Sequence, residues 1–495
     1  MEGNVRTRTR LIRLLALLFA FALVAAACGD SDSDDGGGDD SSEAEAAETT
    51  DETEAPADDG DDADTTEAPA DDGGDGSGEA MVADGEPIVI GLQNPEGDPA
   101  GSFPEYSQAI QAAAEYINAE RGGLGGRPIE ISLCTIAITP DDSQRCANEL
   151  AAEGVELAIS TLNFFGNHFP IYQGSDIPVI VGSPITIADF TSPGVYSIGA
   201  GGGCLGVHTG LVQFATQNIA EITGEPVTKV AVPWADTPPG VVCYADLEQK
   251  PLDVLAGSEP GTSELAGSMP DLEHIGVPIL PASADVTPQA TEVLDFEPDV
   301  IIFSAQGADC WTFVDALGRL GWTPDQIPLV LSGACTDFTA MEAAGDLAVG
   351  IYFIGSGGTI LQPLDTLEGT QLEDATVYQT KAAEYGLSDD DLFKGFATQG
   401  FGLLYTMYQL STDIVAAGGE VTGQSLADAF AATDGSRETF GGPPLDCAGA
   451  PSPYVAVCAS VVNVTEWDGE VQVEIIPSLS GLDLVAGTEL RPTPA

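Results

Sequence analysis

The sequence predicts an α/β protein with two lobes, each built on a doubly wound parallel sheet. Short, continuously apolar runs rich in β-branched residues alternate with helix-like stretches, which is typical of strands whose two faces are covered by helices. This alternation predicts right-handed β-α-β units. Two such series follow one another along the chain. Together they exceed what a single hydrophobic core usually holds, so two lobes are expected.

The strand-like runs fall into two groups. The first group is 87–92, 129–136, 157–161, 179–183 and 196–199, with an apolar-periodic helix at 103–120. The second group is 229–234, 277–280, 300–305, 329–333 and 349–355. Three more helices are expected at 375–386, 392–419 and 422–433, before strand-like runs at 454–467 and 470–476. Amphipathic helices without strands of their own need a sheet to cover, which predicts that the chain returns to the earlier lobe.

The N-terminus has the pattern of an export signal. Four arginines between positions 6 and 13 precede an unbroken apolar run at 14–27. That run is shorter than the ~20 residues of a membrane-spanning helix and matches a signal-peptide core. The small residues directly before Cys28 resemble a bacterial lipobox, in which the cysteine is acylated, although Ala25 replaces the commoner leucine. We expect a signal peptide at 1–27 and lipidation of Cys28, the alternative being a plain signal peptide cut nearby.

An acidic, low-complexity segment follows Cys28. Residues 29–86 contain 24 Asp or Glu and no Lys or Arg, and the octapeptide TEAPADDG occurs at 53–60 and again at 66–73. Such a segment buries too little apolar surface to offset the entropy of ordering, and its like charges repel. We therefore expect 28–86 to be a disordered tether. The alternative is a specific acidic interaction site.

The remaining part, 87–495, is also strongly acidic. It has 54 acidic and 10 basic side chains, a net charge of −44. This charge argues against nucleic acid or anionic lipid as a partner of the folded part. No later run is long and apolar enough to span a membrane.

Eight cysteines remain after Cys28, and an even number on an exported chain predicts disulfide bonds. Sequence alone does not fix the connectivity, and we expect neighbours to pair. The expected bonds are Cys134–Cys146, Cys204–Cys243, Cys310–Cys335 and Cys447–Cys458. No C-x-x-C pair occurs and the three histidines are scattered, so no metal site is expected.

The order of these segments resembles a known family. IVIGLQNPEGDPAGSF (88–103), INAERGGLGGRPIEI (117–131) and FEPDVIIFSAQGADCWTFVDALGRLGW (296–322) are similar to segments of the Leu/Ile/Val-binding protein family. These are type I periplasmic binding proteins that serve ABC importers. The resemblance covers roughly 87–475 and implies two lobes, each an open parallel sheet. Three crossing segments join the lobes, which close around a small solute.

Carried onto this chain, the resemblance divides the folded part into discontinuous lobes. Lobe 1 is expected at 87–203 and 354–444, and lobe 2 at 204–353 and 445–480. Residues 481–495 would form a C-terminal tail.

A glycine-rich stretch, YSIGAGGGCLGVHTG (196–210), contains the spacing G-x-G-x-x-G. A dinucleotide site would need this strand to begin its domain and an acid ~20 residues beyond the glycines. Here the strand ends its lobe, and the first acid after the next strand is Asp236, so no nucleotide cofactor is expected. The resemblance places the stretch at the first crossing between lobes. Glycines absorb backbone rotation, and the expected hinge residues are Gly201, Gly202 and Gly203.

In doubly wound sheets the ligand lies beyond the carboxyl ends of the strands. In the amino-acid binders of the family, the first two loops hold the substrate carboxylate, and an acidic side chain of the fifth holds its ammonium. The resemblance therefore implies ligand contacts at strand-end loops and at flanking aromatic walls. The expected residues are Phe103, Asn163, Phe164, Ser183, Thr186, Trp234, Gln306, Gly333 and Asp337.

This set departs from the family pattern at two of the loops. Asn163 and Phe164 stand where small hydroxylic residues are usual, and Phe164 could equally be core packing. Gly333 stands near the expected acid, with Asp337 four residues further on. An ammonium buried without its carboxylate costs several kcal/mol. A larger, more aromatic or less charged solute than an α-amino acid therefore fits at least as well.

Together these features predict an extracytoplasmic substrate-binding lipoprotein of an ABC importer. Its solute would be a branched-chain amino acid, an amide or a related or aromatic compound. We expect a non-enzymatic monomer without cofactor, anchored in membrane lipid through Cys28 at the outer face of the bacterial cell membrane and partnered by an ABC permease. A sensory subunit on the same fold is one alternative. An extracellular hydrolase is another alternative. Against it, the sequence contains neither the G-x-S-x-G motif of a serine nucleophile nor the H-E-x-x-H motif of a zinc protease.

Overall fold

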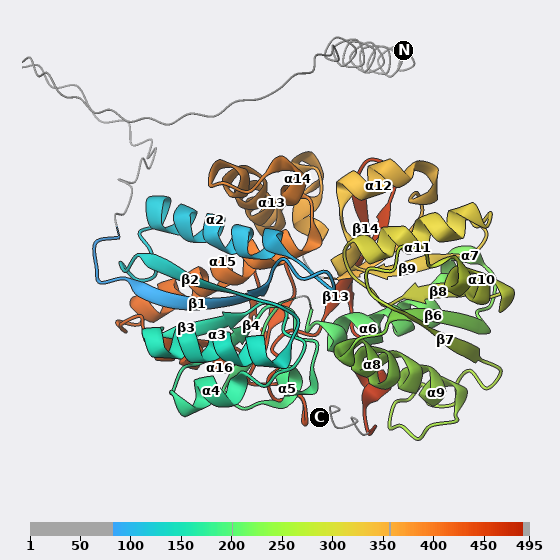
Figure 1. Cartoon of the computed structure of the whole chain (residues 1–495), viewed down its shortest axis with the longest axis horizontal. Helices are drawn as coiled ribbons and strands as arrows, with labels where there is room; N and C mark the ends of the chain where they lie inside the picture. The colour runs from blue at the N-terminus through green and yellow to red at the C-terminus, as the bar shows by residue number, and fades with distance from the viewer. Residues whose placement is uncertain (1–82, 200, 356–357, 489–495) are drawn as a thin grey trace, which may run out of the picture. The chain divides into compact units, whose positions relative to one another are not determined.

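Two large sheets organise the part of the chain that the computed structural model describes, residues 83–199, 201–355 and 358–488 (Figure 1). The first sheet has the strand order β2-β1-β3-β4-β5, and the second has the order β14-β13-β10-β9-β8-β6-β7. We call the first sheet with its helices lobe 1, and the second with its helices lobe 2. The expected signal peptide, Cys28 and the tether up to residue 82 lie outside the described residues.

Five parallel strands form the sheet of lobe 1. They are β1 (Ile88–Pro95), β2 (Ile129–Ile136), β3 (Leu157–Ser160), β4 (Val179–Val181) and β5 (Val195–Ser197). The helices between them are α2 (Pro104–Glu120), α3 (Pro140–Glu153), α4 (Phe169–Gly174) and α5 (Ile187–Thr191). Every residue of β3 and β4 is buried, as their continuously apolar sequence predicts.

Lobe 2 begins with five further parallel strands. They are β6 (Lys229–Ala235), β7 (Glu273–Ile279), β8 (Val300–Phe303), β9 (Leu329–Ser332) and β10 (Tyr352–Gly355). A helical segment precedes β6 and comprises α6 (Cys204–Gln213), the π-helical turn η2 (Phe214–Asn218) and α7 (Ile219–Thr223). The other helices are α8 (Pro238–Tyr244), the π-helical turn η3 (Ala245–Gln249), α9 (Lys250–Ala256), α10 (Thr287–Asp295), α11 (Ala308–Arg319) and α12 (Phe338–Ala344), with the 3₁₀ turns η4 (Gly333–Cys335) and η5 (Gly345–Leu347).

The lobe 2 sheet is mixed, which corrects the expectation of a wholly parallel sheet. Strand β13 (Val462–Trp467) pairs antiparallel with β10, and β14 (Gln472–Leu479) pairs antiparallel with β13. A short turn joins β13 to β14, and the Asp468 carboxylate accepts hydrogen bonds from the backbone N–H groups of Glu470 and Val471 there. Strands joined by so short a turn must run antiparallel.

The helices that follow β10 pack on lobe 1, where they appear in orange in Figure 1. They are α13 (Gly369–Val377), the π-helical turn η8 (Tyr378–Ala382), α14 (Asp389–Leu392), α15 (Gly395–Ala416) and α16 (Gly423–Ala431), after the 3₁₀ turns η6 (Gly358–Leu361) and η7 (Leu364–Thr366). Aromatic rings fasten α15 to α2. Tyr106 stacks on Phe396 with ring centroids 5.6 Å apart, and Tyr116 stacks on Phe401 at 6.3 Å.

The segment between α16 and β13 also lies with lobe 1. Strands β11 (Arg437–Glu438) and β12 (Pro444–Leu445) form a small antiparallel sheet. Val457 then pairs with Ser197 of β5, and the Cys458 N–H donates to the Ser197 carbonyl at 3.0 Å. The lobe 2 tail therefore begins near β13 rather than at residue 445. It ends in a 3₁₀ turn, η9 (Leu482–Val485). In the described residues no helix combines the length and apolarity that crossing a membrane requires.

Three segments pass between the lobes: one from β5 to α6, one after β10 and one leading into β13. The first lies directly against the third. Gly202 has φ +81°, and a Cβ added there would lie 2.5 Å from the Ala459 carbonyl oxygen. A Cβ on Gly206 would lie 1.7 Å from the Gly201 oxygen. Close backbone packing thus accounts for the glycine spacing of this crossing.

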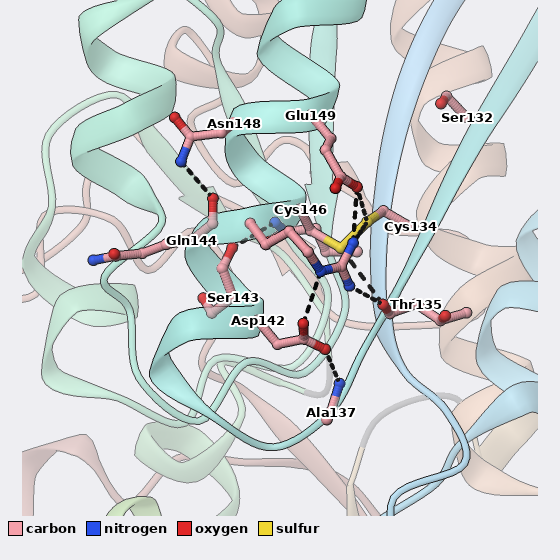
Figure 2. The surroundings of a disulfide bond; sticks show 12 residues. Ser132, Cys134, Thr135, Ala137, Asp142, Ser143, Gln144, Cys146, Asn148 and Glu149 are labelled. Atoms are coloured by element: carbon pink, nitrogen blue, oxygen red, sulfur yellow. Dashed lines mark hydrogen bonds and ion pairs between the residues drawn. A yellow bond between two sulfur atoms is a disulfide. The ribbon is translucent and has the colours of Figure 1, made fainter.

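Four disulfides are present, and they are the four neighbour pairs. Cys134–Cys146 joins β2 to α3, as Figure 2 shows, beside Asp142 and Glu149 of the same helix. Arg145 pairs with both of these carboxylates, at 2.7 and 2.8 Å. Cys204–Cys243 joins the start of α6 to α8. Cys310–Cys335 joins α11 to η4, and Cys447–Cys458 closes the segment before β13.

We expect Gly202→Ala to lower the thermal unfolding temperature more than Gly224→Ala. Both glycines have positive φ, +81° and +75°, so alanine costs roughly 1–2 kcal/mol of backbone strain at either position. Only at Gly202 does the new Cβ also meet backbone of another crossing, whereas nothing lies within 4 Å of it at Gly224. Small-angle scattering should report a more open Gly202→Ala protein. Equal losses in the two variants would contradict a tight contact between the crossings.

Candidate ligand-binding cleft

A cleft in two parts lies between the lobes at the carboxyl ends of their strands. Its inner chamber has a volume of about 70 Å³. Residues that follow β3, β4, β8, β9 and β10 line it, together with the first turns of α6 and α15. The outer chamber, of about 440 Å³, is formed by 98–105 and 394–396 of lobe 1 and by segments of lobe 2. Gln306, Ala334 and Phe396 line both chambers.

Another cavity, of about 270 Å³, lies beside η6, the β11–β12 hairpin and β14. Its acidic lining residues are Asp374, Glu438 and Glu474. It is not at the carboxyl ends of the parallel strands, which is where open α/β sheets bind ligands. The interlobe cleft is therefore the candidate site.

Three lobe 1 side chains form a hydrogen-bonded chain at the inner chamber. The Ser183 hydroxyl, just after β4, donates to Gln399 Oε1 at 2.7 Å and lies 3.3 Å from the Tyr106 hydroxyl. Gln399 is on the first turns of α15. Because its oxygen is already occupied, the Gln399 amide N–H groups remain for another acceptor, and no described residue takes them.

Lobe 2 contributes a buried histidine–carboxylate pair. His208 lies on α6 and lines the inner chamber, and its Nδ1 is 2.9 Å from Glu248 Oε1 and 3.0 Å from Ser304 Oγ. The Glu248 side chain is fully buried in η3. Burial raises the pKa of the Glu248 carboxyl, while the adjacent His208 and Ser304 act in the opposite direction. Of the described residues that line the inner chamber, only His208 is ionisable.

The Cys204–Cys243 disulfide lies beside His208, with the two sulfurs and a histidine nitrogen within 4.8 Å of one another. A metal site would need cysteine thiolates. In the disulfide neither sulfur is a thiolate, so this trio has no metal-binding ligand set. The bond instead fixes α6, which carries His208, against α8.

The outer chamber is acidic and aromatic. Asp98, Glu105, Asp309 and Asp337 line it with a single lysine, Lys394. Burial raises the pKa of the Glu105 carboxyl, and the nearby Lys394 ammonium partly offsets this. Between the chambers, Phe103 meets Phe396 edge to face with centroids 4.8 Å apart. An apolar or aromatic body fits beside these rings, and a negative charge at the mouth is disfavoured.

Residues 87–250 match the model of a family described as periplasmic binding protein. The structure also superposes on solved solute-binding proteins. The chain has the type I periplasmic binding protein fold. This confirms the resemblance seen in the sequence, and the two lobes and interlobe cleft follow the same architecture.

Three solved structures illustrate the similarity. The Rhodopseudomonas palustris BisB5 solute-binding protein of an ABC transporter, in complex with 3,4-dihydroxybenzoic acid, is 18% identical with a TM-score of 0.58, covering 80% of this chain and 97% of that one. A Thermus thermophilus branched-chain amino acid ABC transporter protein with bound valine is 13% identical, with a TM-score of 0.60 and coverages of 81% and 98%. A Streptococcus pneumoniae substrate-binding protein of a branched-chain amino acid transporter, in complex with isoleucine, is 13% identical. Its TM-score is 0.56, and the alignment covers 79% of this chain and 100% of that one. No curated protein sequence matches this one.

In this periplasmic binding protein fold, five of the nine residues expected from the sequence reach the cleft. Ser183 and Gly333 line the inner chamber, Phe103 and Asp337 line the outer one, and Gln306 lines both. All five follow strands or precede helices at the expected edge of the sheets. Whether they touch a solute stays a prediction.

The other four expected residues line neither chamber, because their side chains make hydrogen bonds or packing contacts elsewhere in the fold. The Asn163 amide donates to Ser143 Oγ at 2.9 Å. Phe164 packs in the core of lobe 1, the alternative left open by the sequence. Trp234 stacks on Tyr244 with centroids 5.1 Å apart, and the Thr186 hydroxyl caps α5 by accepting from the Asp189 N–H.

Sequence reasoning missed His208, Gln399 and Phe396. No motif marks them, because each lies near the start of a helix that the crossings bring to the cleft. One signal was available. The sequence predicts that the helices after β10 return to lobe 1. The long helix expected to begin near residue 392 would then start close to the crossing that follows β10, and so close to the cleft.

We expect Asp189 to make the unfolding free energy fall with rising pH. This buried residue fixes the loop that carries Ser183: its Oδ2 accepts from the N–H groups of Ile185 and Thr186, at 2.9 and 2.7 Å. Burial raises the pKa of the Asp189 carboxyl to about 7. The unfolded chain ionises first, near 3.8, so this contribution is complete below that pH and is lost as pH rises through about 7.

Thermal unfolding at pH 5 and pH 8 checks this expectation. Asp189→Asn keeps an oxygen acceptor and removes the buried charge, so its decrease between the two pH values should be smaller than in the unaltered protein. Asp285→Asn is a control, because hydrogen bonds from Thr287 to its exposed carboxylate lower the pKa of Asp285 and move its titration below this range. A decrease in Asp189→Asn as large as in the unaltered protein would contradict the role of Asp189.

Proposed function

We propose that the protein is an extracytoplasmic solute-binding lipoprotein that captures a small molecule between its lobes and delivers it to an ABC importer. The observation that carries this proposal is the cleft formed by both lobes at the carboxyl ends of their strands. Two solved proteins of this fold are named as solute-binding proteins of ABC transporters. A binding protein of this kind needs no covalent chemistry.

Closure of the lobes around the solute would retain it in the cleft. The three crossings permit one lobe to rotate on the other, and a solute that contacts both lobes binds the closed state better than the open one. A micromolar affinity corresponds to ~8 kcal/mol of binding free energy. Part of that free energy would hold the lobes together until the permease reopens them.

The solute we propose is an amide, an aromatic acid or a related compound, in preference to a simple branched-chain amino acid. Solved relatives of the fold hold valine and isoleucine in two cases, and 3,4-dihydroxybenzoic acid and 4-hydroxybenzoate in two others. The described lining of the inner chamber has no carboxylate that could hold an α-ammonium group. The Phe103–Phe396 pair supports an aromatic or apolar body.

A screen of thermal stabilisation should identify at least one stabilising solute among amino acids, amides and aromatic acids. Ala334→Trp should abolish that stabilisation, because Ala334 lines both chambers and an indole would fill their junction. Thr339→Trp, five residues further on at an exposed position of α12, should retain it. Native mass spectrometry of freshly purified protein provides an independent readout. A protein stabilised by no solute, or an Ala334→Trp variant that still binds, would contradict capture in this cleft.

Membrane attachment through Cys28 makes a separate prediction. The unaltered protein should remain in the membrane fraction after a high-salt wash, and Cys28→Ala should appear in the soluble fraction, because one diacylglycerol and one amide-linked acyl chain supply the anchor. Mass spectrometry should find a lipidated N-terminal peptide that begins at Cys28. Retention of Cys28→Ala in the membrane would show that the anchor lies elsewhere.

A further inference from the structure

His208 lines the inner chamber, and only one of its two ring nitrogens is hydrogen-bonded to described residues. Its Nδ1 is engaged by Glu248 Oε1 at 2.9 Å and approached by Ser304 Oγ at 3.0 Å. None of the described residues is hydrogen-bonded to its Nε2. The residue as a whole is only 8% exposed, so Nε2 has little access to bulk water. A polar atom of a bound molecule is its natural partner.

The buried pair decides whether Nε2 donates or accepts. The pair is neutral when it holds two protons, one on Nε2 and one shared between Nδ1 and Oε1. With a single proton it would bury a net negative charge, which costs several kcal/mol. The second Glu248 oxygen, Oε2, has no hydrogen-bond partner among the described residues, so such a charge would be poorly compensated. Nε2 is therefore a donor.

The surroundings select the kind of acceptor. Helices α6 and α15 both begin at the inner chamber without a side-chain cap, and only the first N–H of each is taken by a backbone carbonyl outside the helix and its N-cap, of Pro184 and Thr336 respectively. Their positive ends favour an anion there. The outer chamber has the opposite character, with four carboxylates and one lysine. An elongated solute with a single negative charge would therefore place that charge at the inner end.

We propose that His208 is a specificity-determining residue that donates a hydrogen bond from Nε2 to the carboxylate of a small monocarboxylic acid without an α-ammonium group, with Glu248 as the residue that positions it. The acid's apolar body extends past Phe396 toward Phe103. The Gln399 amide supplies a second donor from lobe 1. This inference rests on the proposed function and names the solute class for the same cleft.

Matched acid and amide pairs test the proposal by titration calorimetry. The probes are benzoate, phenylacetate and 3-methylbutanoate, each compared with its primary amide on the full-length protein. At least one acid should bind about tenfold or more tightly than its amide, as a charged acceptor adds to a hydrogen bond. His208→Gln should bring that ratio toward one. Glu248→Gln should also reduce it, which a purely structural role would not do.

His274→Gln is the matched control. His274 forms a similar pair with Asp253, Nε2 to Oδ1 at 3.1 Å, and lines neither chamber. Its substitution should leave the acid-to-amide ratio unchanged. If Glu248→Gln does not fold, as judged by circular dichroism, His208→Gln carries the test alone.

Three results would overturn the inference: amides that bind as tightly as acids, a His208→Gln protein with an unchanged ratio, or no binding by any of the three acids. In each case the proposed function survives if another solute class stabilises the unaltered protein and Ala334→Trp abolishes that stabilisation. The failure of every solute would instead remove the proposed function itself.

Discussion

The contact between the first and third crossings governs how the two lobes meet. Gly202 and Gly206 bring backbone against backbone where any side chain would collide with a carbonyl oxygen. The first crossing leads directly into α6, and the third leads into β13, which lies between the edge strand β14 and β10 in the lobe 2 sheet. The start of α6 therefore lies directly beside the strand ends of lobe 1, where the Cys204 N–H donates to the Pro184 carbonyl at 3.0 Å. The inner chamber exists because of that placement.

Charge is distributed unevenly around this chamber. The folded part carries a net charge of −44, and the outer chamber shares that acidity. The inner chamber instead contains hydroxyl and amide groups and one imidazole. Because Glu248 is fully buried and beside that imidazole, the two groups are best regarded as one unit that holds a proton. An acidic protein thereby keeps a hydrogen-bond donor at the bottom of its cleft.

Much of the architecture could be predicted from sequence because its strands are continuously apolar. Runs such as those of β3, β8 and β9 cannot lie at a solvated surface, so their number and order indicate two helix-covered sheets. The mixed edge of lobe 2 was missed because apolarity does not encode strand direction. The boundary at 445 failed for a related reason: Val457 pairs with β5, a long-range contact without a local signal.

The candidate site was predictable only where residues directly follow strands. Ser183, Gln306 and Gly333 reach the inner chamber on that basis. Thr186 and Asn163 also follow strands, but their polar atoms form hydrogen bonds to neighbouring protein groups. The spacing of residues in the sequence does not distinguish such a structural side chain from one that lines the cleft. His208, Gln399 and Phe396 come from helices whose starts converge only after the lobes are joined. Tertiary placement, not motif, brings them together.

The Cys204–Cys243 disulfide makes the position of α6 depend on the redox conditions in which the protein folds. It ties the first turn of α6 to α8, and the same helical segment continues into Glu248. Such bonds form in oxidising surroundings and not in a reducing cytosol. In a reducing cytosol the chain would therefore lack the disulfide that fixes α6, which carries His208, against α8. The placement of His208 beside Glu248 therefore depends on whether these two cysteines have been oxidised.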